Sequence, residues 1–314
     1  MSRVELRMPG RDDKVLPAIQ VDRQTEALYR RKLGRAVALM AASYLRSIER
    51  KYARALDANV DAGRLPDIAQ DASAPPPGAA SGDMFDEMKR LRAYWERYFK
   101  TFADEVTAGA FQDLYVDNQR AWQSRLRNAG FDLKLDMTPS QRLVMKAKVQ
   151  ENVALIRSIA QEYHKDVEGE VLRHFIAGRD LKGLQEKLVA RGKVTTNRAA
   201  FIARDQCNKA TAQFNSARQR ELGLHWAVWQ HSSAGKEPRP THVRAGRERW
   251  VFNTQVGIDF RDKFGSVLPG EAINCRCTSR TIIPGMGRTP GGKTFGPGAL
   301  GEITGFPGAY REAA

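Results

Sequence analysis

The sequence lacks the features that would place the chain in a membrane or a secretory pathway. No stretch of its 314 residues approaches the roughly 18 uninterrupted apolar residues that a membrane span requires. The first residues, Met-Ser-Arg-Val-Glu-Leu-Arg, have no apolar core of the kind found in signal peptides. We therefore expect no membrane contact, and we expect the protein to stay in the compartment where it is made.

Cysteine is scarce, and its count is odd. The three cysteines are Cys207, Cys275 and Cys277. An odd number without a signal peptide argues against a framework of disulfide bonds. It indicates thiols that are either free or bound to a metal.

The common catalytic signatures are also missing. The sequence contains no phosphate-binding Gly-x-x-x-x-Gly-Lys-Ser/Thr loop, no His-Glu-x-x-His helix, no Gly-x-Ser-x-Gly elbow and no dinucleotide-binding fingerprint. Cys207 and His231 could form a nucleophilic dyad, but any two such residues would fit that description equally well. We therefore expect that the protein is not an enzyme.

Composition indicates a globular protein with an excess of positive charge. Hydrophobic residues make up 42% and charged residues 28% of the chain, and the formal net charge is +15. The length suits about two domains. Such a charge favours a polyanionic partner, although the basic residues are spread along helical segments and would also suit a solvated surface.

The first part of the chain is predicted to be helical between flexible segments. Residues 1–22 show no sustained period, so we interpret them as an extended arm whose structure depends on partners. An amphipathic helix follows, with apolar residues every three or four positions. These are Leu33, Val37, Met40, Tyr44, Ile48 and Tyr52. Residues 64–82 are rich in Pro, Ala and Gly and are predicted to be a flexible linker.

Helical patterns continue to residue 222. One run opens near Asp83 and continues to Gly130, and Thr138 and Pro139 provide the cap and first position of another that extends to about Gly178. A short helix over 181–189 and a separate helix over 196–222 are predicted next. Gly223 suits a helix C-cap.

The helical spacing of apolar residues ends at Gly223. Short strands are predicted at 224–229, 250–253 and 278–283, separated by turns rich in Gly and Pro. Residues 284–314 have few apolar anchors and are predicted to be an extended tail. The fold class is therefore α+β, with a long, predominantly helical N-terminal region followed by a small α+β C-terminal domain.

Cys275-Arg-Cys277 is the sharpest candidate site, because two thiolates one residue apart can face a single ion. A structural zinc site needs four ligands, so others must come from elsewhere in the fold. His242 is the strongest candidate, since the segment from Pro238 to His242 resembles a turn that can present a side chain. The other candidates are His231, His225, Cys207 and Glu237. The alternative is that both cysteines are small core residues and His242 satisfies a loop.

Several elements of the C-terminal half occur together in a characteristic order. They are Arg204, Asp205 and Gln206, then Asn208, Asn215 and Arg218, then Trp226 to Trp229, Glu237-x-Arg239-x-x-His242, Pro269-Gly270 and Cys275-Arg-Cys277. In order and spacing, residues 140–283 resemble the phage Mu F-like head-morphogenesis family. The sequence departs from that family's usual pattern at Glu237, where Asp is common, and at Arg204-Asp205-Gln206, where Arg-Thr-Glu is common.

The resemblance implies a minor head protein of a tailed bacteriophage. Such proteins act inside the procapsid near the portal, in head assembly or in genome packaging and delivery, so the implied location is the virion and the implied partners are portal, capsid or scaffold subunits and packaged DNA. The resemblance implies a family domain over residues 140–283, and the residue patterns described above place a mainly helical region over 23–139 before it. The resemblance also favours a structural zinc ion bound by His242, Cys275 and Cys277, with Cys207, His231 or Glu237 as the fourth ligand.

Two other functions fit parts of the sequence. Domains of this kind also occur joined to toxin modules, and a metal held by His and Cys can activate water for hydrolysis, so a metal-dependent nuclease is one alternative. A general DNA-binding module is the other, because of the basic charge.

Overall fold

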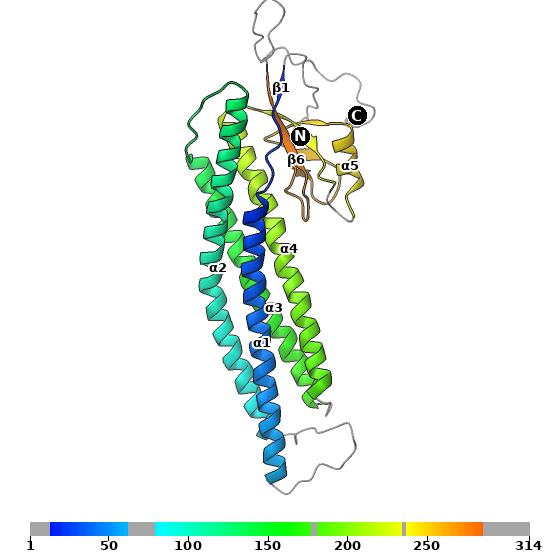
Figure 1. The fold of residues 1–314 in the computed structure, drawn as a ribbon. Coiled ribbons are helices and arrows are strands. Elements are labelled where there is room, and N and C mark those ends of the chain that lie inside the picture. The colour runs from blue at the N-terminus through cyan, green and yellow to red at the C-terminus, as the bar shows by residue number, and fades with distance from the viewer. Residues whose placement is uncertain (1–12, 62–78, 177–180, 234–236, 285–314) are drawn as a thin grey trace, which may run out of the picture. The chain divides into compact units, whose positions relative to one another are not determined.

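The computed structural model describes residues 13–61, 79–176, 181–233 and 237–284 (Figure 1). Its long helices are α1 (Arg23–Asp61), α2 (Ala79–Asn128), α3 (Pro139–Ile176) and α4 (Leu181–Glu221). A short helix, α5 (Pro240–Arg247), follows later in the chain. Within these ranges, no helix combines the length and the apolar character needed to cross a bilayer.

The strands form one four-stranded antiparallel sheet and one small two-stranded sheet. Strands β1 (Lys14–Val15), β6 (Thr278–Ile283), β2 (Trp226–Gln230) and β3 (Val251–Asn253) lie in the order β1-β6-β2-β3, and all pairs are antiparallel. Strand β4 (Ile258–Asp259) pairs with β5 (Ser266–Val267). The α+β fold class predicted from the sequence is confirmed.

The chain divides into two compact units. One unit, here called the bundle unit, contains residues 27–109 and 149–203. The other, here called the sheet unit, contains residues up to 26, residues 110–148 and residues from 204 onward. The strands, α5 and the ends of the long helices therefore belong to the sheet unit.

In the bundle unit, successive helices from α1 to α4 run in opposite directions (Figure 1). The Tyr29 hydroxyl donates to Asn152 Oδ1 at 2.9 Å and joins the early parts of α1 and α3, which run in the same direction. Trp95 of α2 donates from its indole N–H to Ser43 Oγ of α1 at 2.7 Å. The apolar stripe predicted for α1 is buried, because this spacing puts one helix face against the other helices.

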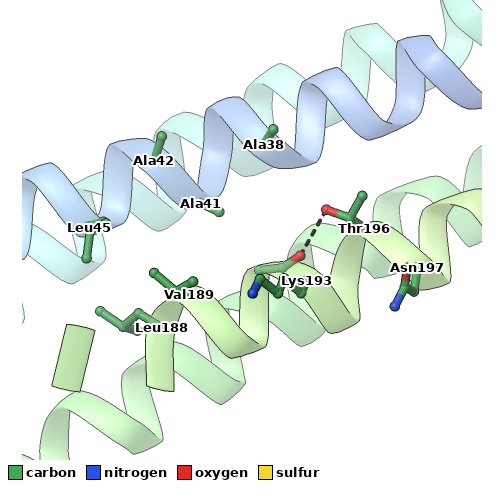
Figure 2. A pocket seen from close by; sticks show the side chains of 10 residues that line it. Ala38, Ala41, Ala42, Leu45, Leu188, Val189, Lys193, Thr196 and Asn197 are labelled. Carbon is green, nitrogen blue, oxygen red and sulfur yellow. Dashed lines mark hydrogen bonds between the residues drawn. The ribbon is translucent and has the colours of Figure 1, made fainter. Parts of the chain in front are cut away.

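A shallow apolar groove lies between α1 and α4 in the bundle unit (Figure 2). The groove is lined by small side chains of α1, including Ala38, Ala41 and Ala42, and by Leu188 and Val189 of α4. At one edge the two backbones approach closely. A Cβ atom built on Gly192 would lie 3.3 Å from the Cβ of Ala41, so a glycine at this position permits the contact.

The sequence prediction of two separate helices over 181–189 and 196–222 is wrong, because α4 is a single helix. It runs without a break from Leu181 to Glu221, through the region around Thr196 where a new helix was expected to start. The hydroxyls of Thr195 and Thr196 donate to the carbonyls of Arg191 and Gly192, four residues earlier, at 3.0 and 2.9 Å. These threonines therefore bond back along an existing helix, whereas the sequence prediction used Thr196 as a helix start.

The flexible segments also differ from expectation where they are described. Helix α2 begins at Ala79, so residues 79–82 are helical and do not belong to a linker. Residues 13–22, predicted to belong to an arm that depends on partners, pack within the chain itself: Leu16 and Ile19 are buried, and β1 pairs with β6. Local periodicity could not reveal this, because the partner strand lies near the other end of the chain. The remaining parts of the predicted arm and linker, and residues 285–314 of the predicted tail, lie outside the described residues.

Candidate metal centre

The residues of the candidate metal centre lie on two segments of the sheet unit. His242 lies in the first turn of α5, which begins at Pro240, and the fixed φ of proline suits the first position of a helix. The segment around His242 is thus a helix, whereas a turn was expected. Cys275 and Cys277 lie in the loop that leads directly into β6.

The three side chains converge. The Nδ1 atom of His242 lies 3.5 Å from the sulfur of Cys275 and 3.8 Å from that of Cys277. The three ligand atoms all lie within 4.8 Å of one another, and all three residues are buried. In a tetrahedral zinc site with Zn–S near 2.3 Å and Zn–N near 2.05 Å, sulfur and nitrogen are separated by about 3.6 Å. The observed spacing therefore fits one face of a zinc tetrahedron.

Aromatic rings enclose the imidazole. Trp229 of β2 and Phe260, which follows β4, have ring centroids 4.9 Å and 4.6 Å from that of His242. Trp229 belongs to a buried apolar cluster that also contains Cys275 and Cys277, and the partly buried Phe260 packs against it. Among the described residues, nothing accepts a hydrogen bond from Nε2 of His242, which is also buried. The ring is thus oriented by packing and by the two sulfur atoms.

The pKa values of the two thiols are shifted in opposite directions. The pKa of Cys275 is lowered to about 4, first because Cys277 donates a hydrogen bond to its sulfur and also because His242 does, while burial opposes the shift. The pKa of Cys277 is raised above its usual range by the hydrogen bond to Cys275 and by burial. A thiolate is the form of cysteine that binds metal, so this pairing prepares one sulfur for coordination.

The loop that carries the cysteines is shaped by Gly270. Its backbone N–H approaches the sulfur of Cys275 at 3.4 Å, and its φ is +94°, a conformation that favours glycine. A Cβ atom there would also lie 3.3 Å from the carbonyl oxygen of Cys277 and from the Cβ of Ala212 in α4. Glycine therefore allows the loop to fold tightly between the cysteines and the helix.

Helix α4 holds the same loop through a buried carboxylate. Asp205 accepts a hydrogen bond from the backbone N–H of Asn274 at 2.5 Å and pairs with Lys209 at 2.9 Å. Arg204 donates to the side-chain oxygen of Asn274 at 3.2 Å. Asn274 has φ +59°, so both contacts fix a left-handed residue immediately before Cys275.

Arg239 fixes the loop from the other side. Its guanidinium donates to the carbonyl of Ile273 at 2.9 Å and lies 4.8 Å from the ring centroid of Phe264. Arg239 is also the residue that precedes α5, so it connects the helix of His242 to the loop of Cys275. Among the predicted polar positions, Arg204, Asp205 and Arg239 thus surround the cysteine loop.

The other predicted polar positions serve the helical part of the sheet unit or are exposed. Asn208 donates to the carbonyl of Arg204 at 2.7 Å. Arg218 is buried and donates to Gln141 Oε1 at 2.9 Å and to the carbonyl of Asp136 at 3.1 Å, which ties α4 to the start of α3. Glu237 is exposed.

No fourth protein ligand joins the cluster within the described ranges, because none of the His, Cys, Asp or Glu ligand atoms there lies within 4.8 Å of all three. Cys207 lies on α4 with its side chain fully buried, and burial raises the pKa of its thiol. Nδ1 of His231 accepts from the backbone of Ser233 at 3.2 Å, and Nδ1 of His225 lies 2.9 Å from the amide of Gln255. The structure therefore brings together His242, Cys275 and Cys277 but not Cys207, His231, His225 or Glu237.

Sequence reasoning missed the aromatic shell and Asn274. The sequence pattern predicts a strand at Trp229 but no role for it at the site, and it predicts no role for Phe260. Trp229 follows Ala227 at strand spacing, and both belong to the apolar cluster, so alternation along β2 was a signal that could have placed it there. Asn274 gave a weaker signal, namely that asparagine tolerates the left-handed conformation in a turn.

The sheet unit is thus an α+β module with a buried His/Cys₂ cluster in the geometry of a metal site. Comparison with known families confirms the resemblance read from the sequence: residues 165–280 match the model of the family described as Phage Mu protein F like protein. The matched region includes Asp205, Arg239 and all three residues of the cluster.

One relative from Haemophilus influenzae is described only as an uncharacterized protein. It is 28% identical over 202 residues, which are 62% of this chain and 43% of the relative. The match therefore spans less than half the length of that relative. No solved structure matches the chain.

Proposed function

We propose that the chain is a minor capsid protein of a tailed bacteriophage, a non-enzymatic factor of head morphogenesis. The match of residues 165–280 to the phage Mu F-like family carries this proposal, since that family is one of head-morphogenesis proteins. In this proposal the protein acts in the virion, inside the capsid or procapsid near the portal. Its partners are the portal protein and capsid or scaffold subunits, and it assists assembly or genome packaging and delivery.

In this proposal the metal centre is structural. His242, Cys275 and Cys277 are the residues that would hold a zinc ion, and the fourth ligand is unassigned. Zinc bound there would link α5 to the loop before β6 without any redox change. The burial of all three residues and the aromatic rings of Trp229 and Phe260 support this role, because a closed, apolar shell excludes substrate.

Co-purification tests the proposed role directly. The full chain would be co-expressed with the portal protein and with capsid and scaffold subunits of the same phage, and procapsids would be isolated on a density gradient. We expect the chain to co-sediment with procapsids or to be retained with tagged portal protein. Absence of the chain from both fractions would contradict the proposal.

A metal-dependent nuclease is the second candidate, and one observation favours it. Only three protein ligands are found among the described residues, and catalytic zinc sites commonly use three protein ligands and an open position. The test is incubation of the purified, zinc-loaded protein with DNA and RNA. Cleavage that is abolished by His242→Ala, with the fold intact by circular dichroism, would favour the nuclease; no cleavage would favour the structural role.

A further inference from the structure

A polar cavity lies in the sheet unit, apart from the three residues of the metal centre. It has a volume of about 370 Å³, which falls in the range of small-ligand sites of roughly 300–1,000 Å³. Its lining includes two arginines, Arg249 and Arg280, and two amide side chains, Gln20 and Gln230. These residues come from the segment after β1, from β2, from the turn after α5 and from β6.

The sheet register explains how Arg280 reaches this position. Arg280 of β6 lies directly opposite Val228 of β2, so the two side chains share one face of the sheet. Trp229, the next residue of β2, packs against His242, and successive residues of a strand point to opposite faces. Arg280 and the metal centre therefore lie on opposite faces of β2 and β6.

Neither arginine is neutralised. No carboxylate of the described residues forms an ion pair with Arg249 or Arg280, and no acidic residue lines the cavity. The nearest acidic residue in sequence, Glu248, is bound by Arg244 at 3.0 Å and by the indole N–H of Trp250 at 2.8 Å. The cavity thus presents two positive charges without an internal counterion.

The backbone holds Arg249 in an unfavourable conformation. Its φ is +55°, a left-handed value that costs energy for a residue with a side chain. Gly246, whose carbonyl accepts from the Arg249 N–H at 3.3 Å, packs so closely on His231 that a Cβ would lie 2.4 Å from the Cβ of that histidine. Strained residues of this kind cluster at ligand sites, where the surrounding structure fixes them.

We propose that this cavity binds a phosphate group. Guanidinium groups present several N–H donors in a planar fork that matches phosphate oxygens, and amide side chains supply further neutral donors. Two guanidiniums and two amides offer more donors than the two oxygens of one carboxylate can accept. The phosphate can come from a nucleic-acid backbone or from a free phosphate or phosphomonoester, and the chemistry at the cavity is the same.

The experiment compares the full-length protein with three variants. Arg280→Gln and Arg249→Gln each remove one charge from the cavity. Arg261→Gln is the matched control, because Arg261 is exposed, has φ +56° and does not line the cavity. Binding is measured to a short duplex DNA in two unrelated sequences at several salt concentrations, to inorganic phosphate by calorimetry, and to an acidic peptide without phosphate. Thermal unfolding checks that each variant is folded.

We expect Arg280→Gln and Arg249→Gln each to weaken phosphate binding about tenfold, as the loss of a charge-assisted hydrogen bond does, while Arg261→Gln binds like the unaltered protein. If the bound phosphate belongs to a nucleic acid, each arginine variant should lose affinity for both DNA duplexes equally. The slope of log affinity against log salt should then become shallower by about one per arginine. If the source is a free phosphate, the effect is seen with inorganic phosphate alone.

Three results would overturn the proposal. The first is that neither DNA nor inorganic phosphate binds. The second is that both cavity variants, folded by their thermal unfolding, bind as tightly as the Arg261→Gln control. The third is that the acidic peptide binds more tightly than either phosphate probe with the same dependence on Arg280 and Arg249. None of these measurements depends on the proposed role in head assembly, so the two proposals fail independently.

Discussion

The carboxylate of Asp205 lies 2.5 Å from the backbone nitrogen of Asn274 and accepts its hydrogen bond. This contact joins helix α4 to the loop whose next residue is Cys275. Because Asn274 adopts a left-handed conformation, the direction in which the chain enters the His/Cys cluster depends on how that residue is held. The helix therefore helps to position a ligand that it does not itself provide.

Removing this carboxylate should loosen the cysteine loop. Asp205→Ala leaves the Asn274 N–H without its acceptor and removes the ion pair with Lys209. We therefore expect the free energy of unfolding, measured in urea, to fall by about 2–3 kcal/mol, and zinc binding to weaken. Asp132→Ala is the matched control, because Asp132 is 87% exposed and its contact with Arg127 is 3.6 Å long. Equal stability of the two variants would argue against the role of Asp205.

Gly246 should tolerate no side chain. A Cβ there would lie 2.4 Å from the Cβ of His231 and 2.8 Å from its backbone nitrogen, so Gly246→Ala forces the chain to move. We expect a loss of about 2–3 kcal/mol in the free energy of unfolding, in the range of overpacked cores. Gly109→Ala is the control, since that helical glycine has nothing within 4 Å. It should raise helix stability by about 0.5–1 kcal/mol. An unchanged free energy of unfolding in Gly246→Ala would contradict the close packing of Gly246 on His231.

The bundle unit should lose stability in mild acid because of a buried histidine. The pKa of His164 is lowered to about 4, mainly by burial, and its Nδ1 is hydrogen-bonded to the hydroxyl of Tyr44. The unfolded chain, with a pKa near 6.5, then binds a proton more readily than the folded chain. The stability that the neutral, buried His164 contributes is fully present above about pH 6.5. It is lost as the pH falls toward 4, which lowers the free energy of unfolding by up to about 3 kcal/mol.

Urea unfolding at pH 7 and pH 5 measures this effect. The loss between the two values should be smaller in His164→Gln than in the unaltered protein, whereas His225→Gln, which changes an exposed histidine, should keep the full loss. An unchanged pH dependence in His164→Gln would show that other groups cause it.

Removing metal should destabilise the sheet unit. A structural zinc ion adds its binding free energy to that of folding, so a chelator should lower the Tm of metal-loaded protein by roughly 10 °C. Cys275→Ser should have a low Tm with or without chelator, since it lacks a ligand. Cys207→Ala should respond to chelator like the unaltered protein. A Tm of the unaltered protein that does not change with chelator would mean that the cluster is an ordinary core.

The sequence predicted well those parts of the fold that depend on local patterns. The apolar spacing from Leu33 to Tyr52 identified α1, and Thr138 and Pro139 marked the start of α3. The prediction was wrong at Thr196, which suits the start of a helix but forms a backward hydrogen bond inside α4.

Contacts between distant segments were harder to predict. Strand β1 pairs with β6, and β1 has only two residues, too few to show a period of its own. At the site, Cys275, Cys277 and His242 were identified by residue type and spacing. The part played by Trp229, Phe260 and Asn274 depends on three-dimensional packing, which no local pattern encodes.

The zinc content of the purified full-length protein tests the central claim most directly. Protein purified without chelator would be analysed for metals together with His242→Ala, Cys275→Ser and Cys207→Ala. If His242, Cys275 and Cys277 hold a structural ion, the unaltered protein and Cys207→Ala should each contain about one equivalent of zinc, and the other two variants should lose it. Less than about half an equivalent in the unaltered protein, or full retention in His242→Ala and Cys275→Ser, would contradict the account.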